Sequence, residues 1–298
     1  MTTGFIPCGA KMPIIGLFAG AVFGNSPLVA VSAFFIGVGA VVVSGVLLKK
    51  FKAFAGKPAP FVMELPAYHL PSPRNILRTT WDRGMDFVKR AATIVLISSI
   101  VLWFLQTYGF VNGTFVAVED SNASLLAAIG NAIAWIFYPL GWMGDMGWKA
   151  TVATFTGLIA KEEVVMTFGT LYNYAGELSE SGNEIWAMIA ADFGAARAYS
   201  FMIFQLLCAP CFAAIGAIKR EMGNAKWTVG TIAYMCGFAY AISMIVYQLG
   251  GLFTGEANFG VLTAAAVVVL AGLLYLVFRK GYRGETGENA VPGKACRR

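Results

Sequence analysis

The run "PLVAVSAFFIGVGAVVVSGVLL", residues 27–48, holds no charged side chain over its whole length. A helix needs roughly 20 apolar residues to cross the hydrocarbon layer of a bilayer, so this run is long enough for one crossing. The composition agrees, because 58% of the 298 residues are hydrophobic and only 13% are charged, which is far too apolar for an ordinary soluble domain. Further crossings are predicted at residues 4–24, 91–108, 199–218, 227–249 and 259–278. The sequence therefore predicts an all-α, polytopic helical membrane protein in contact with a lipid bilayer.

The basic residues are distributed unevenly along the chain. Eighteen of the 22 Lys and Arg lie in five stretches, at residues 49–57, 74–90, 219–226, 279–283 and 294–298. The positive-inside rule places these stretches, and with them the C-terminus, in the cytoplasm, and residues 109–123 and 250–258 outside. Because the basic residues do not gather on one soluble face, the net charge of +6 does not indicate a nucleic-acid partner.

The hydropathy pattern in the middle of the chain does not predict a simple series of membrane crossings. Residues 51–73 form a polar, Pro-rich linker, and residues 74–90 have the spacing of an amphipathic surface helix. Between residues 109 and 198 the apolar pieces are interrupted by "GWMGDMGWK" (141–149) and "KEE" (161–163). Broken or re-entrant helices are tolerated at membrane depth only where they face protein or a cavity, and they are typical of transporter binding sites.

The first chemical group is Cys8 with Lys11, in "FIPCGAKMPIIGLF" (5–18). Lys11 lies about one helical turn from Cys8 and could stabilise its thiolate, which is a good ligand for a borderline divalent ion. The alternative is that Cys8 is a small core residue and that Lys11 extends to the cytoplasmic surface.

The second group is the pair Cys208 and Cys211 in "LLCAPCFAAI" (206–215), with Pro210 between them. Their spacing puts both sulfurs on one helix face, and Pro210, which lacks an N–H, removes the usual partner of the Leu206 carbonyl. The pair could hold a metal ion in passage, act as a redox pair, or simply fill space. Cys236 is interpreted as a packing residue, and no paired C-x-x-C array indicates a structural zinc site.

The third group is Lys161, Glu162 and Glu163, between two apolar pieces. Ionisable residues are costly at membrane depth and indicate function there. Lys161 and one glutamate could neutralise each other, which would leave the second carboxylate for an ion or a proton. The alternative is a short polar loop at the interface. Glu64, in the linker, is ambiguous on chemistry alone.

Four motifs, taken together, resemble the membrane region of the bacterial ferrous iron transport protein B family, over roughly residues 4–280. They are "PCGAKMPII" (7–15), "PFVMELPAYHLP" (60–71), "TFTGLIAKEEVVMTFGTLY" (154–172) and "CAPCFAAIGAIKRE" (208–221). The resemblance implies import of Fe²⁺ across the bacterial inner membrane. It implies ion-pathway roles for Cys8 and Cys211, with Cys208 as a further candidate ligand. It also assigns Glu64, Pro66 and Tyr68 to a linker motif, and Lys161 and Glu162, next to Glu163, to a gate motif.

The resemblance and the hydropathy of the chain together predict a layout of five regions. Residues 1–55 correspond to the end of the core membrane segment, 56–72 to a cytoplasmic linker, 73–220 to the second gate segment, 221–282 to a C-terminal helix pair and 283–298 to a disordered tail. No G-x-x-x-x-G-K-[ST] phosphate loop occurs in the sequence, so no GTP site is expected in this chain. The expected partners are the missing GTPase and first-gate portion of the transporter, together with a homo-oligomer as one hypothesis for its assembly.

Three alternatives belong to other functional classes. A membrane thiol oxidoreductase would use Cys208 and Cys211 as a reversible disulfide. A non-catalytic assembly subunit would use its sulfurs only for packing. A proton-coupled carrier of the nucleoside type would use the broken gate region for an organic substrate.

Overall fold

A computed structural model describes residues 2–51, 72–111, 114–118, 124–172, 174, 176, 178–179 and 181–279. Nearly all of these residues are helical, and the strands present are a single antiparallel hairpin, β1 (Tyr108–Val111) with β2 (Thr114–Ala117). This confirms the predicted all-α class. The predicted linker motif, including Glu64, and the C-terminal tail lie outside the described residues.

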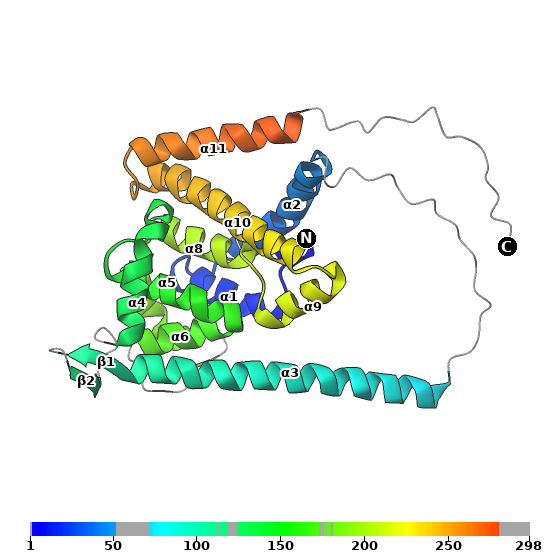
Figure 1. Cartoon of the computed structure of the whole chain (residues 1–298). Helices are drawn as coiled ribbons and strands as arrows, with labels where there is room; N and C mark the ends of the chain where they lie inside the picture. The colour runs from blue at the N-terminus through cyan, green and yellow to red at the C-terminus, as the bar shows by residue number, and fades with distance from the viewer. Residues whose placement is uncertain are drawn as a thin grey trace, which may run out of the picture.

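The chain forms eleven α-helices in this described part, and several are too short to cross a bilayer (Figure 1). They are α1 (Met12–Ala21), α2 (Pro27–Lys49), α3 (Pro73–Thr107), α4 (Leu125–Ala134), α5 (Gly144–Ile159), α6 (Glu163–Leu171), α7 (Trp186–Asp192), α8 (Ala195–Leu207), α9 (Phe212–Met222), α10 (Ala225–Thr254) and α11 (Val261–Phe278). Short 3₁₀ turns precede or join them: η1 (Thr3–Phe5), η2 (Gly9–Lys11), η4 (Trp135–Leu140) and η5 (Asn183–Ile185).

Three helices, α2, α10 and α11, are long and apolar enough to cross a membrane. A fourth crossing is possible if Leu125–Leu140 and Gly144–Ile159 count as one span, but these two pieces are bent by 102°. The bend and the separate short helix α6 confirm the expectation of broken helices in the gate region. Gly141, with a φ of +84°, makes this turn in a backbone conformation that side chains with a Cβ rarely adopt.

Two predicted crossings are not continuous helices. Residues 4–24 form η1, η2 and the ten-residue α1, which is ~15 Å long and cannot cross the ~30 Å hydrocarbon layer alone. Pro7 precedes η2, and Pro13 lies in the first turn of α1, where proline is tolerated. Residues 199–218 are split into α8 and α9 at the Pro210 break. Both differences leave helix ends inside the protein rather than at a membrane surface.

The predicted surface helix at 74–90 and the predicted crossing at 91–108 are one continuous helix, α3. The hydroxyl of Ser72 accepts from the backbone N–H of Asn75 and caps its start. The N-terminal half of α3 extends past the other helices, and its C-terminal end leads into the β1–β2 hairpin (Figure 1). Leu77 and Trp81 in that half are exposed, as expected of a helix that lies on a membrane surface.

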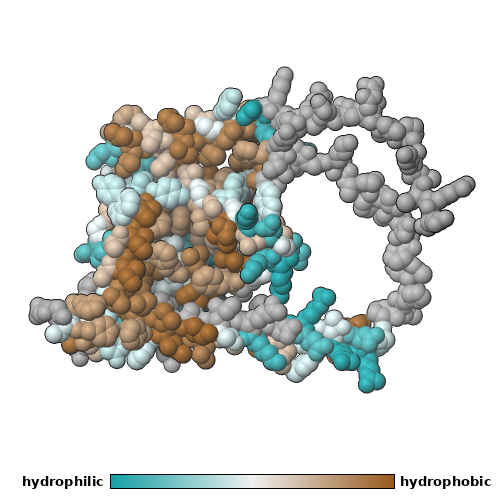
Figure 2. Space-filling model, viewed as in Figure 1, coloured by the Kyte–Doolittle hydropathy of each residue, from teal (hydrophilic) through white to brown (hydrophobic). Residues whose placement is uncertain are grey.

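The hydrophilic residues gather at one end of the molecule. Figure 2 shows them mainly over α9 and the N-terminal half of α3. The ends of α2 and α11 meet, since the Lys50 ammonium donates to the carbonyls of Leu276 and Val277 at the end of α11. The β1–β2 hairpin and the α10–α11 turn lie at the other end (Figure 1). The described parts of the basic stretches, at the ends of α2 and α11, on α9 and in the N-terminal half of α3, therefore lie at one end (Figure 1), which is the arrangement that the positive-inside rule predicts.

Helix α8 runs through the centre of the fold, and ten of its 13 residues are buried. It packs against α10, α2 and α1. At its start the Glu256 carboxylate, from the α10–α11 turn, accepts from the backbone N–H groups of Ala196 and Arg197 at 3.1 and 3.4 Å. A carboxylate at a helix N-terminus satisfies unpaired donors and opposes the positive end of the helix dipole. Glu256 therefore holds the start of α8. The broken helices meet at the opposite end of α8.

The two-ended layout predicts the membrane topology. We expect reporter fusions that end at residue 223, in the α9–α10 turn, to report the cytoplasm, and fusions at residue 256, in the α10–α11 turn, to report the opposite side. The physical reason is that Lys219, Arg220 and Lys226 flank the first turn, whereas the second carries Glu256. Reports from the same side for both fusions would contradict this layout.

Candidate functional site

Three interrupted segments meet at the end of α8. The Lys11 ammonium, at the start of α1, donates to the Leu206 carbonyl at 2.6 Å and to the Gly4 carbonyl at 2.8 Å. The Lys161 ammonium, in the break between α5 and α6, donates to Cys208 Sγ at 3.0 Å and to Gln205 Oε1 at 3.3 Å. We call Lys11, Lys161, Gln205 and Cys208 the thiol–lysine cluster. Its members come from sequence positions up to 197 residues apart, and each is at most 2% exposed.

The cluster exists because α8 stops inside the protein. Cys208 is the C-cap, with an extended ψ of 174°, and Pro210 follows two residues later. The last carbonyls of a helix have no intrahelical donor, and a proline shortly after the end cannot supply one. The Leu206 carbonyl, which the sequence predicted to lose its partner, takes its hydrogen bond from Lys11 instead. A cation at this end also opposes the negative end of the helix dipole.

The structure separates the predicted gate residues. Lys161 is buried, Glu162 is exposed and Glu163 is partly buried. Within the described residues, no ion pair joins Lys161 to either glutamate. The expected neutralisation inside the "KEE" sequence is therefore not what the structure contains, because the helix geometry turns Lys161 towards α8 and Glu162 away from it.

The cysteines surround Lys11 without forming a preformed metal site. Cys208 is buried, Cys211 is partly buried and Cys8 is exposed, and all three interact electrostatically with the Lys11 ammonium. Among the described residues no group of three or more His, Cys, Asp or Glu side chains is arranged to hold a metal ion. Met12, the residue after Lys11, carries a thioether and is 48% exposed.

Cys236 is closer to the cluster than its packing interpretation implied. It lies on α10, and its thiol interacts with the backbone of Ala209 and electrostatically with Cys208 and Lys161. Gln205 was also missed by the sequence reasoning. The available signal was a polar side chain inside the apolar run "FMIFQLLC", residues 201–208, which is costly to bury unless it is hydrogen-bonded.

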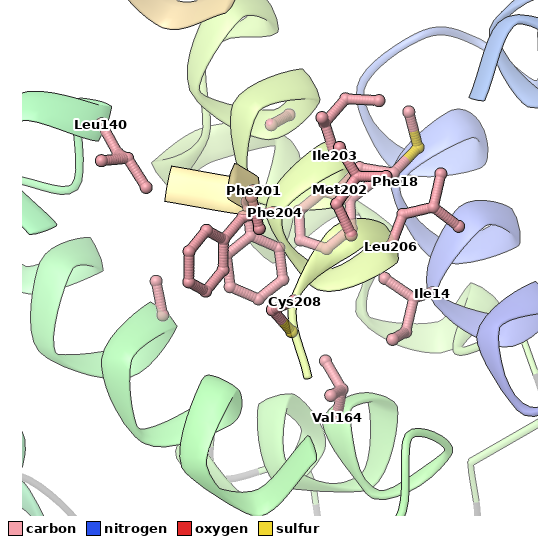
Figure 3. Packing of buried hydrophobic residues seen from close by; sticks show 14 of the residues in the cluster. Ile14, Phe18, Leu140, Val164, Phe201, Met202, Ile203, Phe204, Leu206 and Cys208 are labelled. Atoms are coloured by element: carbon pink, nitrogen blue, oxygen red, sulfur yellow. The ribbon is translucent and has the colours of Figure 1, made fainter. Parts of the chain in front are cut away.

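A second group, four phenylalanines, covers one side of the cluster. Phe18, Phe168, Phe193 and Phe201 are at most 2% exposed, and all six distances between their ring centroids lie between 5.1 and 6.0 Å. We call these four residues the phenylalanine layer. Figure 3 shows Phe18 and Phe201 with their neighbours on α1 and α8, and Cys208 at the end of α8 near Ile14 and Val164.

In three segments of the chain, a residue of the cluster and a residue of the layer are separated by the same number of positions. Phe18 follows Lys11 by seven residues, Phe168 follows Lys161 by seven, and Phe201 precedes Cys208 by seven. Seven residues of helix are about two turns, or ~10 Å. Lys11 and Lys161 lie just before α1 and α6, and Cys208 caps the end of α8, so each pair joins a helix end to a ring on the adjoining helix. The three helices α1, α6 and α8 thus carry the polar cluster at one level and the aromatic layer two turns away.

A polar group lies beyond the layer. Asp192, next to Phe193, accepts from the Tyr172 hydroxyl at 2.8 Å and forms an ion pair with Lys149 at 3.1 Å. Tyr172 stacks on Phe168. The phenylalanine layer therefore separates a partly exposed ion pair from the buried thiols.

The two lysines that hold helix ends allow a matched stability test. We expect Lys11→Met to lower the free energy of unfolding by roughly 1–3 kcal/mol, because it leaves buried carbonyls without a donor. Lys50→Met removes a similar bond at the end of α11, where the side chain is only partly buried and water can replace the ammonium. Thermal unfolding in detergent would measure both, and an equal loss would contradict a special role for the buried cap.

Comparisons with known proteins match most of the chain. The family model for the C terminus of ferrous iron transport protein B matches residues 30–83, and the Gate model, described as nucleoside recognition, matches residues 88–225. No solved structure matches.

Curated relatives give a consistent result. The Fe(2+) transporter FeoB of Methanocaldococcus jannaschii is 34% identical over 257 residues, which is 83% of this chain and 36% of the relative. The FeoB proteins of Escherichia coli O6:H1 and Salmonella typhimurium are 31% and 30% identical, over 92% and 94% of this chain. The chain spans only 41% and 42% of those two relatives.

Proposed function

We propose, on the premise that this chain belongs to the ferrous iron transport protein B family and corresponds to its C-terminal membrane region, that it forms the ion pathway and gate of an Fe²⁺ importer. The remaining part of such a transporter, with the GTPase and the first gate segment, is its proposed partner. Its proposed location is the inner membrane of a bacterium, with the C-terminus in the cytoplasm.

One observation carries this proposal: three interrupted segments bring two lysines and the Cys208 thiol together in the interior of the protein, and the thiols of Cys8 and Cys211 also interact with the Lys11 ammonium. Discontinuous helices whose ends point at one place are the usual construction of ion sites in transporters. In lipid such unpaired backbone groups are tolerated only where they face protein or line a cavity.

The proposed ligands are Cys8, Cys211 and Cys208. Thiolates suit a borderline ion such as Fe²⁺ better than Mg²⁺ or Ca²⁺. A pathway needs a site that is weak enough to release its ion, and the lack of a ready-made group of three acidic, His or Cys ligands in the described residues fits passage better than storage.

Lys11 closes this pathway when no ion is present. Its ammonium occupies the negative end of α8 and lies near all three thiols, so a second cation is repelled while it remains there. Two unit charges 4 Å apart repel each other by ~4 kcal/mol at an effective dielectric constant of 20. An arriving divalent ion must therefore displace Lys11 from the Leu206 carbonyl.

The phenylalanine layer closes the pathway on the side of Asp192. Its four rings fill the space between α1, α6 and α8, and hydrophobic constrictions of this kind block ions because water leaves them. The same three helices carry the cluster, so a movement that displaces the lysines also moves Phe18, Phe168 or Phe201.

The Gate match to a nucleoside-recognition model supports a second candidate, a carrier for a nucleoside. All relatives reported above are named Fe²⁺ transporters, which favours iron. Uptake of radioactive iron and of a radioactive nucleoside by the same cells would separate the two. The thiol oxidoreductase alternative has less support, because Cys208 and Cys211 are free and Cys208 faces Lys161.

The ion-pathway proposal predicts the effect of removing single thiols. In cells that lack their own ferrous iron uptake and also produce the missing GTPase portion, Cys8→Ser or Cys211→Ser should lower the rate of ⁵⁵Fe²⁺ uptake about tenfold, the effect of losing ~1.4 kcal/mol of binding. Cys296→Ser, near the end of the sequence, is the control. Normal uptake in both pathway variants, with normal protein levels, would overturn the proposed ligands.

The gate proposal predicts access to the buried thiol. Cys208 is 2% exposed, so we expect it to react slowly with an alkylating reagent, and we expect Phe168→Ala or Phe201→Ala to accelerate the reaction several-fold. Peptide mass spectrometry reads Cys208 separately from the other thiols. Phe253→Ala removes a ring that is 92% exposed and serves as the control. An unchanged rate in both layer variants would show that the rings do not restrict access.

A further inference from the structure

The ammonium of Lys161 lies in a pocket made by one sulfur and one amide oxygen. In the described part of the chain its hydrogen-bond partners are Cys208 Sγ at 3.0 Å and Gln205 Oε1 at 3.3 Å, and no carboxylate pairs with it. Gln205 is fully buried, and Lys161 is 1% exposed. Burial of a charge without an opposite charge is costly. Packing alone therefore does not explain why the Sγ and Oε1 atoms surround a buried ammonium.

A chain of hydrogen bonds fixes the orientation of the Gln205 amide. The Thr154 hydroxyl donates to the Ala150 carbonyl at 2.8 Å, so its single proton is used. Its oxygen can then only accept, and it accepts from Gln205 Nε2 at 2.7 Å. The amide oxygen of Gln205 must therefore face the other way, towards Lys161 and Cys208. The hydrogen bond to Thr154 on α5 thus sets the orientation of the Gln205 amide independently of Lys161.

The sulfur side of the pocket is part of the helix end. Cys208 Sγ lies 3.6 Å from the Gln205 carbonyl oxygen and 3.9 Å from Gln205 Oε1. The negative end of the α8 helix dipole lies at the same place as these sulfur and oxygen atoms, so it also favours a cation there. Gln205 and Cys208 are three residues apart and so project from the same face of α8.

We propose that Cys208 Sγ and Gln205 Oε1 form a mixed sulfur–oxygen site for the transported divalent ion, and that the Lys161 ammonium fills this site whenever the ion is absent. The inference rests on the proposed function and adds to it a ligand, Gln205, and a built-in competitor, Lys161. The ammonium is a cation that contacts the same sulfur and oxygen atoms that would bind the metal ion, and the flexible lysine side chain can move away from them.

This arrangement suits a borderline ion in transit. A single sulfur with oxygen ligands selects against the hard ions that prefer all-oxygen sites, and few ligands make release easy. Glu162 and Glu163 follow Lys161 directly in the chain, and Glu162 is exposed. A displaced Lys161 ammonium can therefore pair with one of these carboxylates.

Cobalt is the probe for the experiment, because Co²⁺ bound to a thiolate gives a charge-transfer absorption that reports sulfur ligation. The whole chain, in lipid nanodiscs under reducing and anaerobic conditions, is titrated with Co²⁺. We expect Lys161→Met to tighten binding about tenfold or more, since the competitor is gone. Gln205→Leu and Cys208→Ser should each weaken binding about tenfold, and Cys208→Ser should also reduce the absorption.

Matched variants separate the site from general effects. Lys50→Met removes a lysine that holds another helix end without a thiol, and it should leave the titration unchanged. Gln205→Asn keeps the amide but shortens it, so it should weaken binding even if Gln205→Leu does not fold. Thermal unfolding of each variant identifies those that are merely destabilised.

Three outcomes would overturn the inference in different ways. If Cys211→Ser abolishes the absorption while Cys208→Ser, Gln205→Asn and Lys161→Met leave it unchanged, the ion uses the other thiols, and the proposed pathway stands without this site. If Lys161→Met weakens binding, Lys161 supports the site instead of competing for it. Unchanged titrations in every cysteine variant, Cys8→Ser included, would overturn the proposed ion pathway as well.

Discussion

The constraint on which the structure depends is the incomplete hydrogen bonding at the end of α8. A helix that ends in the interior of a membrane protein leaves carbonyl groups that water does not reach, and each needs a donor from elsewhere. The donor for Leu206 is Lys11, 195 residues away in sequence. The same ammonium holds Gly4, so the first residues of the chain are tied to the centre of the fold. This bond thus joins the start of α1 to the α8–α9 break.

A regular spacing then connects this polar centre to the aromatic layer. The seven-residue steps from Lys11 to Phe18, from Lys161 to Phe168 and from Phe201 to Cys208 run along three different helices. Because side chains at this spacing share a helix face, a rotation or shift of one helix moves a polar group and a ring together. The hydrogen bonds at the cluster and the ring contacts of the layer are therefore features of one packing arrangement.

The sequence predicted the features that depend on local chemistry. The length of the run at 27–48 and the position of Pro210 were sufficient for α2 and for the free Leu206 carbonyl. It did not predict which donors meet across the fold. Lys161 was expected to pair with a neighbouring glutamate, but the turn at 161–162 directs it to Cys208 and Gln205 instead. Phe193 and Cys236 join their groups only through contacts between helices, and no local pattern in one sequence encodes such contacts.

In the proposed ion pathway, the two buried ammoniums limit how an ion can use the site. A divalent cation that entered beside both lysines would bring together four positive charges, and at 4 Å each pair of unit charges costs ~4 kcal/mol even at a dielectric constant of 20. The ion must therefore exchange with an ammonium, and each lysine sits at a different break, Lys11 before α1 and Lys161 before α6. Since these breaks also carry Phe18 and Phe168 two turns further on, exchange at the site and displacement of the rings involve the same helices. In the proposed pathway, a movement at the start of α1 or α6 therefore displaces a lysine and a ring of the layer together, so ion entry and gate opening would involve the same helices.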